Sequence, residues 1–188
     1  MWSALAARPA RGRELAGWFV VLLGAGSLQL PALGRMEMHG VGIMQLEMVR
    51  TSPKAAQLTS ALGPDGLSAA RQQLYVDFGL LVLYGIVLSA ACVLLAQRAQ
   101  RRNAMGIAKA GPLFAALAVI AAACDALENV ALLAVTFGHT AQPWPALASG
   151  FASMKFALLT VVLAYLVVGV AVTTVDRSAA PIGVDGDS

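Results

Sequence analysis

Charged side chains are scarce in this sequence, because Asp, Glu, Lys and Arg make up only 12% of its 188 residues. A soluble domain carries about 25%. Hydrophobic residues make up 59% of the chain, and the mean hydropathy is +0.73. This balance excludes an ordinary soluble domain and predicts a membrane protein. The formal net charge of +3 reflects the uneven distribution of basic residues described below, so we expect no nucleic-acid partner.

The sequence also lacks the usual motifs of redox, nucleophilic and nucleotide chemistry. It has two cysteines and no Cys-x-x-Cys pair. In the helices expected below, Cys92 and Cys124 differ in depth by ~10 Å, beyond the reach of a disulfide. Both are therefore predicted to be packing residues. There is no Ser-His pair, and His39 and His139 stand alone in expected loops.

A methionine-rich stretch, MEMHGVGIMQLEMV at residues 36–49, raises the question of a copper site. Thioethers and an imidazole are ligands that suit Cu(I). However, methionine is also a flexible filler of apolar gaps, and the spacing here matches no regular ligand geometry. The pattern favours packing, and we expect neither a metal nor a cofactor.

What the sequence does contain is four long apolar runs, at residues 16–34, 74–96, 111–136 and 147–173. About 20 helical residues cross the ~30 Å hydrocarbon core of a bilayer, and lipid-exposed backbone must satisfy its own hydrogen bonds. We predict an all-α membrane protein with a four-helix transmembrane bundle over residues 16–176.

The first run begins after basic residues, as the apolar core of a signal peptide does. Its core is long and no A-x-A site follows, so we expect a retained helix.

Basic residues set the expected orientation, because Lys and Arg concentrate on the cytoplasmic side. Eight of them fall in the two tails and in the loop between the second and third runs, whereas four fall in the long loop 35–73. The sequence predicts a multi-pass protein of the plasma (inner) membrane with a cytoplasmic N-terminal tail, 1–15, and a cytoplasmic disordered tail, 177–188. The eight residues are Arg8, Arg11, Arg13, Arg98, Arg101, Arg102, Lys109 and Arg177.

The loop 35–73 is expected to lie outside the cytoplasm and to contain short helices. Thr51 or Ser52 can cap a helix, and Pro53 suits its first turn. Gly63 suits its end, and Gly63-Pro64-Asp65-Gly66 is typical of a turn. We expect four residues of this helix to face inward, namely Ala55, Leu58, Ala61 and Leu62.

The third run is interrupted by CDALENV at residues 124–130, which places three polar groups in an apolar helix. Glu128 and Asn129 lie within about 60° of Asp125 around a helix. A charge facing lipid costs at least ~2.5–3.5 kcal/mol. This face is therefore expected to look into the bundle, together with the small residues Ala118, Ala121 and Ala122 and with Leu132.

Other runs carry polar groups at the same expected depth. Asp77 opens the second run with Tyr84 two turns further on the same face, and Lys155 lies early in the fourth run. Gln29 of the first run is at a similar depth. Intramembrane ionisable groups are candidates for function, and we predict that they form a polar pocket open to the extracytoplasmic side. The alternative is a structural lock, in which Lys155 pairs with Asp125 or Glu128 and fixes the helix packing.

The order of these motifs resembles a group of small four-helix bacterial membrane proteins of uncharacterised function. The resemblance covers residues 47–159 and rests on LEMVRTSP, GPDG, VDFGLLVLYG, DALEN and MKFALL. It implies no activity. It adds Glu47 to the residues expected to act together, which are Glu47, Asp77, Tyr84, Asp125, Glu128, Asn129 and Lys155.

Three functions follow from this pattern as alternatives. The first is binding of a lipid-like or amphipathic small molecule by the polar pocket. The second is a membrane enzyme that uses paired carboxylates for acid/base chemistry on a lipid-like substrate, with candidate residues Asp125, Glu128 and Lys155. The third is an accessory subunit of a larger membrane complex. A membrane-protein partner or a homo-oligomer is expected as well. Ion or proton transport is disfavoured, because the cytoplasmic halves of the helices carry no chain of ionisable groups.

Overall fold

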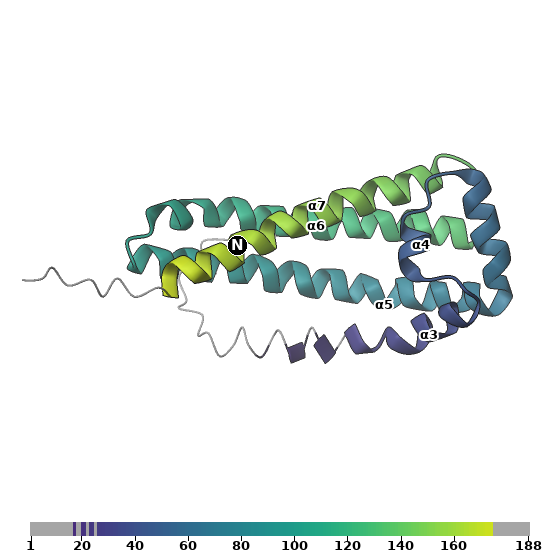
Figure 1. The fold of residues 1–188 in the computed structure, drawn as a ribbon, viewed down its shortest axis with the longest axis horizontal. Helices are drawn as coiled ribbons and strands as arrows, with labels where there is room; N and C mark the ends of the chain where they lie inside the picture. The colour runs from purple at the N-terminus through teal and green to yellow at the C-terminus, as the bar shows by residue number, and fades with distance from the viewer. Residues whose placement is uncertain (1–16, 18–19, 22, 25, 175–188) are drawn as a thin grey trace, which may run out of the picture.

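The computed structural model describes residues 17, 20–21, 23–24 and 26–174, and over these residues it is helical with no strand. The elements are α3 (Leu30–Met38), α4 (Ile43–Glu47), α5 (Ser52–Arg101), α6 (Met105–Thr136) and α7 (Trp144–Thr174) (Figure 1). Three of them, α5, α6 and α7, are long and apolar enough to cross a membrane. The predicted all-α membrane class is confirmed at this level.

The first predicted run, 16–34, is only partly covered, because several of its residues lie outside the described part. Its described residues are helical up to Ser27, then form a turn at Leu28 and Gln29. The next helix, α3, has Pro31 in its first turn and continues to Met38. Helix therefore continues past residue 34, where the apolar run ends. Proline is favoured in the first turn of a helix because a backbone N–H at that position has no acceptor within the helix, so proline, which lacks the N–H, loses no hydrogen bond.

The helix α5 is bent at Gly63, the one residue inside it with non-helical angles (φ 59°, ψ −174°). Glycine adopts a positive φ without the steric cost that a Cβ brings. The predicted turn over 63–66 is thus confined to Gly63, and helix resumes at Pro64. In Figure 1 the segment 52–62 runs across the end of the bundle, roughly perpendicular to the rest of α5.

The three long helices extend beyond the apolar runs that predict them. The second runs to Arg101 rather than residue 96, and α6 begins at Met105 rather than residue 111. Only residues 102–104 connect the two helices, and Asn103 makes the reversal with a φ of 56°. Because polar residues can continue a helix outside the hydrocarbon region, hydropathy alone marks the membrane part and not the helix ends.

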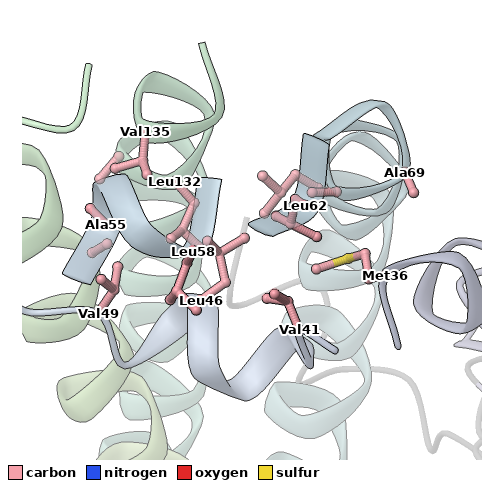
Figure 2. Packing of buried hydrophobic residues seen from close by; sticks show 14 residues of the cluster. Met36, Val41, Leu46, Val49, Ala55, Leu58, Leu62, Ala69, Leu132 and Val135 are labelled. Carbon is pink, nitrogen blue, oxygen red and sulfur yellow. The ribbon is translucent and has the colours of Figure 1, made fainter. Parts of the chain in front are cut away.

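We call residues 41–62 the cap, since α4 and the segment 52–62 both cover the same end of the bundle (Figure 1). Figure 2 shows Leu46 and Leu58 of the cap beside Leu132 of α6. These residues belong to one apolar cluster, the cap-side core, which also includes Met36 and Val135. Three of the four residues expected to face inward are buried, namely Ala55, Leu58 and Leu62, whereas Ala61 is exposed.

A second apolar cluster, the far core, lies toward the α5–α6 connection. It consists of Leu88, Cys92, Leu95, Ala115, Ala118, Val162 and Tyr165. The helices approach closely there, because a Cβ placed on Gly111 would lie 2.3 Å from Ala96 Cβ. The sequence-predicted polar residues lie between the two cores. The chain therefore stacks an apolar, a polar and another apolar layer along the bundle axis.

Candidate functional site

The polar layer begins with one face of α6, which the structure buries as the sequence predicts. Asp125 is 4% exposed, Glu128 0% and Asn129 2%. The small residues and Leu132 on the same face are buried as well. Along α6, Ala118 of the far core precedes these three residues and the cap-side core follows them. The polar groups therefore meet other helices and not lipid.

Lys155 of α7 stands at the centre of the carboxylates. Its Nζ lies 2.9 Å from Asp125 Oδ1, to which it donates a hydrogen bond, and 2.7 Å from Glu128 Oε2. A third carboxylate, Glu47 Oε1, lies 3.9 Å away. The lysine side chain is only 7% exposed. A buried ammonium is stable only where charges of opposite sign face it, and α6 and α4 supply them here.

The helix α5 adds a hydroxyl to the same network. Tyr84 donates a hydrogen bond of 2.8 Å to Asp125 Oδ2. Asp125 therefore has both oxygens engaged, one by Lys155 and the other by Tyr84. One residue along α5, Gly85 keeps the two helices close, because a Cβ there would lie 3.0 Å from Ala122 Cβ.

A second carboxylate group lies beside the first. Asp77 accepts hydrogen bonds of 2.8 Å from the amides of Gln29 and Asn129, one on each of its oxygens. The pairing joins α5 and α6 to the turn that precedes α3. Gln29 is predicted from the sequence to lie at this depth but is not among the seven predicted site residues, and the structure brings it into the layer.

Glu47 reaches the layer from the cap and not from a long helix. It is the last residue of α4, and its side chain is 15% exposed. Its neighbour Leu46 points into the cap-side core and is fully buried. Burial raises the pKa of the Glu47 carboxyl above its ordinary 4.5, although the charge of Lys155 acts in the opposite direction.

The carboxylates of this layer outnumber its cations. Three acids, Glu47, Asp125 and Glu128, face a single lysine, and a fourth, Asp77, is paired with amides. The hydrogen bonds are also unevenly shared. Within the part of the chain that the structure describes, Glu128 Oε1 has no hydrogen-bond partner, whereas Oε2 lies 2.7 Å from the Lys155 ammonium. The layer therefore keeps an unpartnered acceptor oxygen beside its single lysine.

The structure thus brings all seven predicted residues into one layer: Glu47, Asp77, Tyr84, Asp125, Glu128, Asn129 and Lys155. Whether they bind a ligand remains a prediction.

The methionines of the stretch 36–49 do not gather at one place. Met36 is fully buried in the cap-side core, while Met38 and Met44 are exposed.

Comparisons with protein-family models, with curated proteins and with solved structures found no match.

Glu47 gives the cap an expected dependence on pH. Because the pKa of Glu47 is raised in the folded cap, the folded state holds this proton more tightly than the unfolded state does. The resulting stabilisation is complete below about pH 4.5 and is lost as the pH rises through the raised value. We expect backbone amides of residues 41–50 to exchange hydrogen more slowly at about pH 5 than at about pH 8, after correction for intrinsic rates.

The matched variant for this prediction is Glu47→Gln, which keeps the shape of the side chain and removes its titration. The difference in corrected exchange between the two pH values should then disappear. An unchanged difference in Glu47→Gln would assign the pH dependence to another group and contradict the prediction.

Proposed function

We propose that this protein binds a lipid-like or amphipathic small molecule at the polar layer, with the polar head among the carboxylates and the apolar part among the membrane-spanning helices. One observation carries the proposal. The layer holds more buried carboxylates than cations, and Glu128 Oε1 is buried without a hydrogen-bond partner among the described residues. A purely structural lock needs only matched charges, because an unmatched buried charge is destabilising.

The position of the layer supports the same proposal. The cap closes it from the end of the bundle, and Glu47 is the acid that joins the two. The cap is attached to α5 through the bend at Gly63 and to α3 through residues 39–42. We propose that the pocket opens on the cap side when this segment moves, since the cap is a small unit attached at both ends by non-helical joints.

The membrane placement follows from the basic residues. We propose that the run 16–34 supplies a fourth spanning helix and that both tails are cytoplasmic. The protein then lies in the plasma (inner) membrane of a bacterium, with the cap on the extracytoplasmic side. The short connection 102–104, next to Arg98 and Arg101, fits the cytoplasmic end. The motifs quoted above support membership of the small four-helix bacterial group.

A second candidate function is acid/base catalysis on a lipid-like substrate. It is favoured by the unequal surroundings of two neighbouring carboxyl groups that share one lysine. Asp125 has both oxygens engaged, whereas Oε1 of Glu128 has no hydrogen-bond partner among the described residues. Carboxyl groups in different environments can take opposite roles in proton transfer. Glu128 would exchange the proton with the substrate, and Asp125 and Lys155 would stabilise the developing charge.

The experiment that tests the binding proposal is native mass spectrometry of the protein purified in mild detergent, followed by extraction and identification of any retained molecule. We expect a discrete amphipathic molecule on the wild type and its loss from Asp125→Asn. Asp65→Asn is the matched control, because it is the same substitution at an exposed position of α5. It should retain the molecule.

The other outcomes are also decisive. A retained molecule that is converted to a product would favour the enzyme. Absence of any retained molecule from well-folded wild type, across several detergents, would contradict binding. It would favour the accessory subunit, in which the polar layer is a structural lock and the partner is another membrane protein or a second copy of this chain.

A further inference from the structure

We infer that the head group of the bound molecule is a protonated primary amine, held between Glu47 and Glu128 beside Lys155. This inference rests on the proposed function, since it names the chemical class of the ligand of the same site. It follows from matching the hydrogen-bond donors of the layer to its acceptors, residue by residue.

The hydrogen bonds formed by the side chains of the layer reach two of the four acids, Asp125 and Asp77. Tyr84 donates to Asp125, and the amides of Gln29 and Asn129 donate to Asp77. A lysine ammonium has three donors. One of them goes to Asp125 Oδ1 at 2.9 Å, and the ammonium also faces Glu128 Oε2.

The unsatisfied acceptors are therefore concentrated on the other two acids. Glu128 Oε1 is buried and has no partner among the described residues. The ion-pair partner of Glu47 in the same part of the chain is Lys155, at 3.9 Å, which is too long for a hydrogen bond. Both acids lie beside the same ammonium, at 3.9 Å for Glu47 and 2.7 Å for Glu128.

The group that complements this arrangement must bring positive charge and more than one N–H. A protonated primary amine has both, since it carries three donors and one charge, as lysine does. Hydrogen bonds between charged groups are about twice as strong as neutral ones, and they gain further strength in a site closed by apolar layers.

Other head groups fit less well. An anionic head group would be repelled by the carboxylates. An alcohol brings a single donor and no charge. A quaternary ammonium has no N–H and binds instead to the faces of aromatic rings. The Tyr84 hydroxyl is committed to Asp125, and the ring nearest the ammonium, Phe156, is already beside Lys155 Nζ at 4.8 Å. Ca²⁺ and Mg²⁺ prefer six or more oxygen ligands, and here Lys155 takes the central position.

Glu47 is the expected point of entry for the amine. Its side chain is the most exposed of the three acids around Lys155. The exposed fraction of the side chain is 15% for Glu47, 6% for Asp125 and 0% for Glu128. It also belongs to the cap and not to a membrane-spanning helix. An amine that arrives from the cap side meets Glu47 before it reaches Glu128.

The test uses three probes that share one alkyl chain: decylamine, decyltrimethylammonium and decanol. Each is titrated below its micelle-forming concentration into wild-type protein that has been washed free of retained molecules, and the bound fraction is read from native mass spectra. We expect decylamine to bind at least about tenfold more tightly than the other two, since each lost charged hydrogen bond lowers affinity by about that factor or more.

Variants assign the preference to the two glutamates. Glu128→Gln and Glu47→Gln should each weaken decylamine binding by about tenfold or more, with little effect on decanol. Glu37→Gln is the matched control, because Glu37 is exposed on α3 and outside the polar layer. It should bind decylamine as the wild type does. Glu47→Gln keeps the test informative if Glu128→Gln fails to fold, because Glu47 lies outside the membrane-spanning helices.

Two outcomes would overturn the inference and leave the proposed function standing. One is a preference of the wild type for decyltrimethylammonium or decanol, and the other is amine binding that neither glutamine variant weakens. In both cases an amphipathic molecule still binds. If none of the three probes binds and no molecule is retained on purification, the proposed function fails together with the inference.

Discussion

Lys155→Met is expected to abolish stable folding of the bundle. The substitution keeps most of the apolar length of the side chain but leaves Asp125, Glu128 and Glu47 without their shared cation. Removing one partner of a buried ion pair costs about 3–5 kcal/mol, because the remaining charge stays buried and unpaired. That amount is comparable to the total stability of many domains. The measurement is the monodisperse fraction in size-exclusion chromatography, together with the thermal unfolding midpoint in detergent.

A compensating variant separates lost charge balance from lost packing. Adding Asp125→Asn and Glu128→Gln to Lys155→Met removes two of the three uncompensated charges and should restore much of the folded fraction. The exposed Lys109 provides the matched control, and Lys109→Met should unfold as the wild type does. A stable Lys155→Met protein would show that these acids are not held as charges by the lysine. It would then no longer follow that the excess of carboxylates over cations in the polar layer favours a bound ligand.

Leu46→Ala is expected to release the cap from the end of the bundle. Leu46 is fully buried and lies beside Leu58 and Leu132 in the cap-side core (Figure 2). Truncating a buried leucine to alanine costs about 2–5 kcal/mol. The five-residue helix α4 has little stability of its own, since short helices are held by tertiary packing. The loss should therefore appear as faster hydrogen exchange over residues 41–62, with α6 and α7 unchanged.

The matched control is Met44→Ala in the same short helix, where the side chain is 53% exposed. Its exchange should match the wild type. Equal loosening of all three long helices in Leu46→Ala would contradict an independent cap, and so would unchanged protection of residues 41–62. A released cap also takes Glu47 away from Lys155. In the same variant we therefore expect the bound molecule to exchange faster.

Much of the polar layer could be predicted from the sequence because membrane helices leave few alternatives. Asp125, Glu128 and Asn129 must turn from lipid, and helical periodicity places them on one face. The antiparallel order of short-looped helices then brings Asp77 and Lys155 to the same level. Glu47 is different, since a single acid in a loop carries no such constraint. It entered the prediction only through the resemblance to the bacterial group.

The helix boundaries show where sequence patterns fail. Hydropathy predicted a second helix over 74–96, but α5 runs on both sides of that range because polar residues can remain helical in water. A four-residue turn was predicted at residues 63–66, but of these only Gly63 departs from helical angles in the structure. A glycine followed by proline indicates a break, but the local sequence does not say how abruptly the helix resumes.

The sequence by itself determined the helical membrane class, the buried face of α6 and the level at which charges collect. These follow from the cost of exposing polar groups to lipid, which acts on each segment separately. Only the tertiary structure decided which groups pair. Lys155 joins Asp125 and Glu128, while Asp77 takes the amides of Gln29 and Asn129 instead. Such pairing depends on helix rotation and close approach to within an ångström, and these arise from the packing of all the helices together.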